Sequence, residues 1–277
     1  MRKRGSGWRG AVALGLVVAV TPLVSDAQSP EPGSVASVRG EANAPEQALP
    51  ELSDVLERLD RLYMASSSRG RLKMTVVNER GSRELEIEQW SRGRDEALMV
   101  IRSPAREAGT ATLRSEEGLW NYAPRADRLI RVPTGMLSEA WMGSHFSNDD
   151  LMRETSLERD YHAALRWAEL DGERVVQVEL RPREGAPVVW EKVLYEVSAE
   201  DGLPHRARFY SGGAVVRTMN FSGVRELGGR RLPAVVTVLP AKPGEYTRME
   251  YVEMAFDVPV EASTFTRQGL RRVARTR

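Results

Sequence analysis

The sequence contains no cysteine and only three histidines. The absence of cysteine excludes disulfide bonds, a thiol nucleophile, a cysteine zinc site and lipid attachment to an N-terminal cysteine of the mature chain. His145, His162 and His205 are far apart, and none stands in the H-E-x-x-H pattern of zinc peptidases. We therefore predict that the protein has no metal site.

Sequence motifs of catalysis are also missing. There is no G-x-S-x-G nucleophile elbow and no glycine-rich loop for a phosphate or a dinucleotide. Asp149 and Asp150 are adjacent, whereas glycoside hydrolysis needs two carboxylates that face each other. We predict that the protein is not an enzyme and has no cofactor. A hydrolase of unusual design stays open, and loss of an activity on replacement of Asp150 or His145 would support it.

No excess of one charge sign is present. The chain has 40 Lys and Arg residues against 39 Asp and Glu residues, and the two signs are interspersed along the sequence. A nucleic-acid surface needs clustered basic residues, so we expect no nucleic-acid partner. With 277 residues, 41% of them hydrophobic, the chain is long enough for one large domain or two small ones.

Residues 1–27 have the features of a secretory signal peptide. A positively charged segment precedes the apolar run AVALGLVVAV at 11–20, and Ser25 and Ala27 are the small residues expected near a cleavage site. We predict cleavage after Ala27 and a location in the periplasm. An uncleaved membrane anchor is the alternative, but the apolar run is short for a span and Pro22 interrupts its end.

Residues 28–49 are rich in Pro, Ala, Ser and Glu and contain no aromatic side chain, which predicts a disordered linker. The folded domain is expected over residues 50–277. It begins with an amphipathic helix of about four turns, for which Ser53 and Asp54 are candidate caps. The apolar residues at three- and four-residue spacing are Leu52, Val55, Leu56, Leu59, Leu62 and Tyr63.

Beyond Ser68, apolar and polar residues alternate with a period of two in short runs separated by turn residues. This pattern predicts an antiparallel meander of about a dozen strands. So many strands need a large, strongly curled sheet or a closed barrel. The predicted strands cover residues 71–79, 83–91, 96–103, 109–116, 118–124, 127–133, 161–170, 174–182, 188–197, 205–211, 214–224, 231–240 and 246–258.

One long interruption, between Pro133 and about Arg159, separates the two halves of the meander. Asn148 followed by Asp149 and Asp150 predicts a capped helical turn, because asparagine accepts a backbone N–H and acids favour the positive end of a helix. Capping and contact with solvent therefore explain the two acids better than chemistry does.

Large apolar side chains are frequent in the strands and in the interruption. Ordinary core packing is one interpretation of them. The other is that a curled sheet with a helix across its concave face leaves a cavity for a lipid-like guest, which flexible methionine side chains suit well. The candidate lipid-binding residues are Trp90, Met99, Ile101, Trp120, Tyr122, Trp141, Met142, Phe146, Leu151, Trp190 and Tyr195.

The segment WMGSHFSNDDLM at 141–152 resembles a motif of the LolA-like family of outer-membrane lipoprotein-sorting proteins, W-M-G-S-D-F-T-N-D-D-L. The chain departs from it at His145, where aspartate is usual, and at Ser147, where threonine is usual. Weaker similarity lies in GGRRLPAVVTVLP at 228–240 and in the terminal VPVEASTFTRQGLRR. The resemblance covers about residues 50–273.

This resemblance implies a mainly β fold, an incomplete antiparallel β-barrel with helices that close its concave hydrophobic face. It also implies a carrier, expected to be a monomer, that binds acylated lipoprotein or lipid cargo and works with an inner-membrane transporter permease. We expect Trp141, Met142, Phe146 and Leu151 to form an apolar lid over the barrel mouth, with a turn at Gly143. A module of the same fold that senses lipid or docks on a membrane protein, as in an envelope-stress pathway, stays open as the alternative.

Overall fold

The structure, a computed structural model, describes residues 48–276 with the exception of 149, 151–155 and 187. The predicted signal peptide at 1–27 and nearly all of the predicted linker at 28–49 lie outside the described residues. No helix of the described part is both long enough and apolar enough to cross a membrane.

Thirteen strands form one antiparallel sheet, and each of them coincides with a run predicted from the alternation of apolar and polar residues. The largest differences are at residues 188–191, which precede the ninth strand instead of belonging to it, and at the first strand, which begins four residues before its predicted start at 71. The strands are β1 (Ser67–Asn78), β2 (Gly81–Arg92), β3 (Glu96–Ser103), β4 (Ala111–Ser115), β5 (Gly118–Ala123), β6 (Arg128–Arg131), β7 (Tyr161–Leu170), β8 (Glu173–Pro182), β9 (Lys192–Ser198), β10 (Pro204–Ser211), β11 (Ala214–Leu227), β12 (Arg230–Pro240) and β13 (Tyr246–Phe256).

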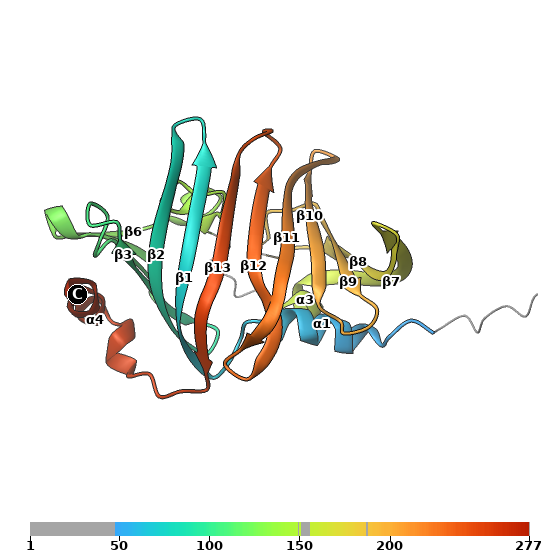
Figure 1. Ribbon diagram of the computed structural model, residues 1–277, viewed down its shortest axis with the longest axis horizontal. Coiled ribbons are helices and arrows are strands. Elements are labelled where there is room, and N and C mark those ends of the chain that lie inside the picture. The colour runs from blue at the N-terminus through green and yellow to red at the C-terminus, as the bar shows by residue number, and fades with distance from the viewer. Residues whose placement is uncertain (1–47, 149, 151–155, 187, 277) are drawn as a thin grey trace, which may run out of the picture. The chain divides into compact units, whose positions relative to one another are not determined.

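The sheet consists of two meanders that meet in the middle. Its strand order is β6-β5-β4-β3-β2-β1-β13-β12-β11-β10-β9-β8-β7, so β1 and β13 pair although they stand at opposite ends of the strand sequence. The sheet curls, and its outer strands lie behind the central ones in Figure 1. The edge strands β6 and β7 do not pair within the described residues. The predicted incomplete barrel is therefore confirmed.

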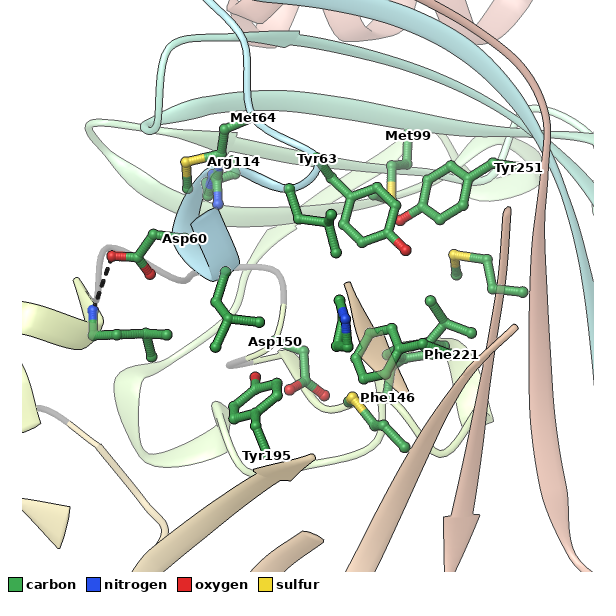
Figure 2. A pocket seen from close by; sticks show the side chains of 17 residues that line it. Asp60, Tyr63, Met64, Met99, Arg114, Phe146, Asp150, Tyr195, Phe221 and Tyr251 are labelled. Atoms are coloured by element: carbon green, nitrogen blue, oxygen red, sulfur yellow. Dashed lines mark hydrogen bonds between the residues drawn. The ribbon is translucent and has the colours of Figure 1, made fainter. Parts of the chain in front are cut away.

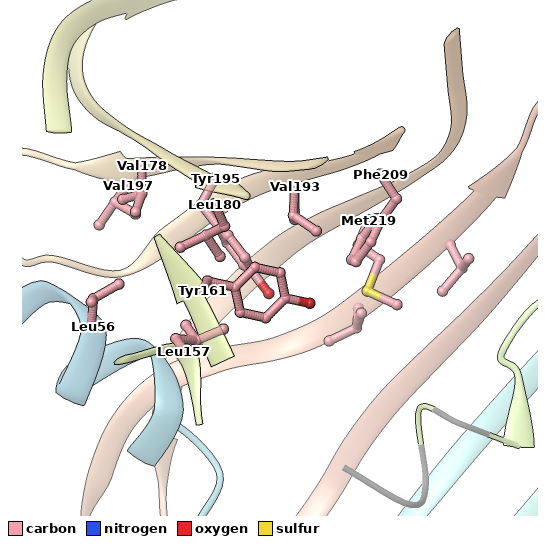
Figure 3. Close-up of a cluster of buried hydrophobic side chains, with 13 residues drawn as sticks. Leu56, Leu157, Tyr161, Val178, Leu180, Val193, Tyr195, Val197, Phe209 and Met219 are labelled. Atoms are coloured by element: carbon pink, nitrogen blue, oxygen red, sulfur yellow. The ribbon is translucent and has the colours of Figure 1, made fainter. Parts of the chain in front are cut away.

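Two helices and one irregular segment cover the concave face of the sheet. The helix α1 (Leu52–Arg61) lies with the short helix α3 (Leu157–Asp160) over one half, where Leu56, Leu157 and Tyr161 join a cluster of inward side chains from β8 to β12 (Figure 3). The other half is covered by the segment 132–148. This segment contains the 3-10 turns η2 (Thr134–Met136) and η3 (Trp141–Gly143).

The predicted first helix is real but shorter than expected. It has ten residues, its N-cap is Glu51, and no side chain caps it, so the prediction of Ser53 and Asp54 as caps was wrong. The chain leaves the helix after Arg61, and the next residues pack Leu62 and Tyr63 against the sheet. These two side chains are partly buried on the sheet, and the last of the four predicted helical turns does not form.

A C-terminal helix that sequence analysis did not predict covers the convex face at β2–β5. The 3-10 turn η4 (Ala262–Phe265) leads into α4 (Arg267–Arg275), which Thr266 caps through a 2.9 Å bond from the Gly269 N–H to Thr266 Oγ1. Leu270 is 0% exposed and packs among side chains of β3, β4 and β5. Elsewhere the convex face carries ion pairs, such as Arg69 with Glu88.

Candidate functional site

A cavity of about 300 Å³ lies between α1 and the concave face of the sheet. Its volume is at the lower end of the range of known ligand sites, about 300–1,000 Å³. All but three of the lining residues are apolar or aromatic, and they come from both meanders and from the residues that cover them (Figure 2). These are Leu59, Leu62, Tyr63, Met64, Met99, Phe146, Leu157, Tyr195, Pro204, Met219, Phe221, Val236, Met249 and Tyr251.

Two stacked tyrosines form part of the cavity wall. The rings of Tyr63 and Tyr251 lie 4.8 Å apart and nearly parallel, at 14°. The Tyr63 hydroxyl donates a 2.7 Å hydrogen bond to the carbonyl oxygen of Pro233. Burial raises the pKa of Tyr251 to about 12, and burial together with the neighbouring Tyr251 raises the pKa of Tyr63 still further. Both hydroxyls are therefore neutral at physiological pH and add no charge to the cavity.

The remaining three lining residues, Asp60, Arg114 and Asp150, are charged. Asp60 ties α1 to α3, because its Oδ2 accepts hydrogen bonds from the Leu157 N–H at 3.0 Å and from the Ser156 hydroxyl at 3.3 Å. The two acids contribute to structure, as described next for Asp150. The cavity is thus an apolar space with a few polar groups at its border.

Asp150 forms a buried ion pair with Arg217 of β11. The two guanidinium nitrogens donate to the two carboxylate oxygens at 2.6 and 3.0 Å, and each side chain is only 7% exposed. Bidentate geometry of this kind is the strong form of an arginine–carboxylate contact. Of the role predicted for Asp150, contact with solvent was therefore wrong, whereas capping is confirmed by the bond from the Ser147 N–H to its Oδ2.

Aromatic rings enclose the guanidinium of Arg217. It lies 4.2 Å from the ring centre of Phe209 and 4.5 Å from that of Trp190, and these two rings meet edge to face at 5.2 Å. Such cation–π contacts gain strength when the cation is removed from water. Trp190 thus holds the arginine that fixes Asp150, and it does not line the cavity.

Within the interruption, the capping hydrogen bonds are made by Ser147 and Asp150 and not by the predicted Asn148. Ser147 Oγ accepts the Asp150 N–H at 3.2 Å, and Asp150 Oδ2 accepts the Ser147 N–H at 2.8 Å, which together form a capping box. Asn148 instead donates its side-chain N–H to the carbonyl oxygen of Met136 at 3.1 Å. The predicted cap at Asn148 was wrong by one residue, and Asp149 lies outside the described residues.

Trp141 anchors the interrupting segment on the concave face. Its side chain is 0% exposed, and its Nε1–H donates a 3.0 Å hydrogen bond to Thr112 Oγ1. The chain then turns through Met142 and Gly143, whose φ angles are 48° and 66°. The turn predicted at Gly143 is present, and Arg83 holds it by donating to the Met142 carbonyl oxygen.

His145 attaches the same segment to the start of β13. Its backbone N–H and its Nδ1 both lie 2.9 Å from Thr247 Oγ1, and its Nε2 lies 3.3 Å from Glu245 Oε2. A hydrogen bond from Lys242, then one from His145, holds the pKa of Glu245 below its usual range. His145 is thus bound at both ring nitrogens. The described residues contain no group of acids and histidines that could hold a metal ion.

The predicted lipid-binding residues fall into separate groups. Met99, Phe146 and Tyr195 line the cavity. Ile101, Trp141 and Met142 belong to the adjoining cluster on the concave face, under the segment 132–148. Trp90, Trp120 and Tyr122 pack on the convex face with α4 and do not line the cavity, Trp190 encloses Arg217, and Leu151 lies outside the described residues.

The misplacement of Trp90, Trp120 and Tyr122 has a simple geometric cause. Successive side chains of a strand point to opposite faces of the sheet. Trp90 of β2 pairs with Leu98 of β3, and both side chains point to the convex face. Met99, the next residue of β3, points to the concave face and lines the cavity. Both faces of β3 are buried. The apolar character of a side chain therefore did not show whether it points to the concave or to the convex face of the sheet.

Sequence analysis also missed Arg217, Asp60 and the tyrosine pair. A signal for Arg217 was available, because Arg217, Met219 and Phe221 alternate on one face of β11. An arginine in phase with apolar residues predicts a buried cation, which needs an acidic partner. The acid itself could not be chosen, because Asp150 is 67 residues away in the chain.

A family model described as "-like: Uncharacterized protein" matches residues 93–272. The chain belongs to this family of uncharacterized proteins. A comparison of the sequence with curated proteins found no match.

Solved structures with the same fold give further detail. A protein described as an outer membrane lipoprotein-sorting protein domain, from Vibrio parahaemolyticus, has a TM-score of 0.68 and 21% identity over 79% of this chain and 97% of that chain. A DUF1329 family protein from Desulfovibrio piger has a TM-score of 0.70 and 21% identity, over 78% and 96% of the two chains. A LolA superfamily protein from Nitrosomonas europaea has a TM-score of 0.65 and 24% identity, over 78% and 97%. The predicted LolA-like fold is thus confirmed.

Proposed function

We propose that the protein is a periplasmic carrier that binds the acyl chains of lipoproteins or lipids in the cavity under α1 and moves them toward the outer membrane. The observation that carries this proposal is the cavity itself, which is apolar on nearly all sides and lies under a helix. The LolA-like fold, shared with a protein named for lipoprotein sorting, supports it.

The free energy of acyl transfer explains why such a carrier is needed. Each methylene group removed from water contributes about 0.8 kcal/mol, so a cargo with two or three acyl chains faces a cost on the order of tens of kcal/mol in an aqueous gap. A cavity that shelters the chains removes most of this cost. Delivery then requires an acceptor that binds the cargo more favourably, and loading requires energy from a partner such as an inner-membrane transporter permease.

The wall that can move is α1, because the polar contacts that hold it lie in its C-terminal half and just after it. Arg58 donates a 2.6 Å hydrogen bond to the Asp201 carbonyl oxygen, Asp60 accepts from the α3 backbone, and Tyr63 donates to Pro233. Only Leu56 is fully buried within the helix. A shift of α1 away from the sheet would enlarge the space of about 300 Å³ without breaking the sheet.

The proposal also includes the location of the protein and its oligomeric state. The predicted signal peptide at 1–27 supports export to the periplasm, and the protein acts as a monomer. Purification from periplasm, followed by light scattering, tests both statements.

The deciding experiment is mass spectrometry of organic extracts from the protein purified without detergent. A stoichiometric lipid or acylated peptide is expected. Val236→Phe, which places a ring in the cavity, should carry less lipid, whereas Val215→Phe, at an exposed position outside it, is the matched control. An empty wild-type protein that also fails to take up a fluorescent fatty acid would overturn the proposal.

A further inference from the structure

Arginines from two distant parts of the sequence gather at one edge of the sheet. The 3-10 turn η1 (Pro124–Ala126) and strand β6 supply three of them, and one side of α4 supplies three more. Asp127 joins the two groups, because its Oδ1 lies 3.4 Å from Arg271 and 3.2 Å from Arg275. We call this set the basic rim: Arg125, Arg128, Arg131, Arg267, Arg271 and Arg275.

The basic rim has a local excess of positive charge. Its six arginines face two acids, Asp127 and Glu117, of which Glu117 lies 3.5 Å from Arg267. The whole chain, by contrast, has a net charge of only +1. Arg125, Arg128 and Arg131 are exposed, and within the described part of the chain they form no ion pair. Three cationic side chains are therefore available to a partner.

Two exposed apolar side chains accompany these charges. Ile130 of β6 is 52% exposed, and Met136 of η2 is 50% exposed. Ile130 stands between Arg128 and Arg131 in the sequence. Ile130 shares a face of β6 with Arg128, because alternate side chains of a strand point to the same side. A large apolar side chain beside cations is the combination that binds the interface of an anionic bilayer, where the apolar group inserts and the cations contact lipid headgroups.

The edge itself is poorly suited to another kind of partner. β6 has only four residues, two of them arginine, and short charged edge strands disfavour pairing with a strand from another chain. We propose that the basic rim docks on the surface of an anionic lipid membrane. The partner is defined by charge complementarity, and the docking does not depend on which cargo the cavity holds.

Docking at this edge would place the cavity close to the lipid. Arg114 of β4 lines the cavity and pairs with Leu119 of β5, and β5 pairs with the edge strand β6. Neighbouring strands lie about 4.8 Å apart, so the cavity wall is about 10 Å from the edge that touches the membrane. An acyl chain would then have a short path between bilayer and cavity.

Vesicle sedimentation tests the proposal with the exported and processed protein, whose intact mass shows that the signal peptide is absent. Vesicles of equal parts phosphatidylglycerol and phosphatidylcholine are compared with vesicles of phosphatidylcholine alone. The triple variant Arg125→Gln, Arg128→Gln and Arg131→Gln removes the unpaired cations. Its matched control is Arg174→Gln, Arg181→Gln and Arg183→Gln, three exposed arginines in and just after β8, next to the opposite edge.

The wild-type protein and the control variant should sediment with the anionic vesicles and not with the neutral ones. Three charges lost from a membrane-binding surface should weaken this binding at least about tenfold. Binding should also fall when added salt shortens the Debye length from about 30 Å to about 3 Å. Equal binding to neutral vesicles, or an equal loss in both triple variants, would overturn the proposal. Failure of the wild-type protein to bind anionic vesicles would also overturn the proposal. That result would favour an acidic protein as the partner.

Lipid extracts of the same variants separate this inference from the proposed carrier function. The rim variant should retain the same cavity lipid as the wild type, because none of its three positions lines the cavity. A failure of docking with lipid still bound would contradict only the rim. A cavity without lipid, together with intact vesicle binding, would contradict only the carrier.

Discussion

The helices α1 and α4 cover opposite faces of one sheet, and they are attached in different ways. On the convex face, α4 buries Gly269, Leu270 and Ala274, and Leu270 packs among side chains of β3, β4 and β5. On the concave face, α1 buries only Leu56 completely, leaves a cavity beside it, and is held by hydrogen bonds from Arg58 and from Tyr63, which follows its C-terminal end. Apolar burial thus contributes more to the attachment of α4, whereas α1 lies beside a cavity and depends more on polar contacts.

The largest expected effect comes from the buried ion pair that holds the concave covering. Asp150→Asn keeps a carbonyl oxygen for the Ser147 N–H but leaves the charge of Arg217 without compensation. Loss of one partner of a buried pair costs about 3–5 kcal/mol of the free energy of unfolding. Urea denaturation of the variant measures this loss.

Glu57→Gln is the control, because Glu57 pairs with Arg61 on the exposed side of α1. A surface pair contributes about 1 kcal/mol or less. Equal losses in the two variants would show that the Asp150 pair contributes no more than a surface pair.

A second test compares one leucine from each helix. Leu270→Ala in α4 should lower the free energy of unfolding by about 2–5 kcal/mol and leave uptake of a fluorescent fatty acid unchanged. Leu59→Ala in α1, at the cavity wall, should cost on the order of 1 kcal/mol and alter uptake. If uptake changes only in the Leu270 variant, the convex face holds the ligand and the comparison is reversed.

Tyr63→Phe isolates one polar contact of α1. The variant keeps the ring stacked on Tyr251 but leaves the buried Pro233 carbonyl oxygen without its donor, at a cost of about 1–3 kcal/mol. Amides of residues 52–61 should then exchange with deuterium faster, while those of α4 keep their rate. Unchanged exchange in α1 would mean that this contact does not hold the helix.

The smallest effect concerns acid stability. Hydrogen bonds from the side chain and the backbone N–H of Ser66, together with Arg230, hold the pKa of Asp257 below its usual range. Arg230 also donates to the Met64 carbonyl oxygen, so Asp257 helps to hold the chain just after α1. A lowered pKa in the folded state contributes stability above the unfolded pKa of about 3.9, and this contribution is lost as the pH falls through the folded value.

Asp257→Asn should therefore lower stability at neutral pH, and its difference from the wild type should shrink as the pH falls below about 4. Thermal unfolding over a pH series measures this difference. A constant difference across the series would assign the effect of the substitution to packing instead of charge.

The strands could be predicted from the sequence because the two-residue alternation is a local property. The faces could not, since a strand buried on both sides, such as β3, has no polar side to mark its orientation. The α4 helix had a local signal, Thr266 as cap and Leu270, Val273 and Ala274 at helical spacing, that sequence analysis did not use.

The candidate site was predictable only in part for the same reason. Met99, Phe146 and Tyr195 lie at the cavity, but its other walls depend on contacts between residues far apart in the chain. Tyr63 meets Tyr251, and Asp150 meets Arg217, only because the segments before β1 and between β6 and β7 pack on strands of the second meander. Residue types and spacing along the chain contain no information about such pairs.

The pairing of β1 with β13 also has a consequence for the order in which the protein matures. Residues that meet beside this pair, such as Ser66 and Asp257, are 191 positions apart, and contacts over such separations form late because a long loop must first close. The last strand to be synthesised is thus one of the two in the middle of the sheet. A chain still leaving the ribosome lacks β13 and with it Met249 and Tyr251, so the wall of the cavity is complete only after the last strand has been made.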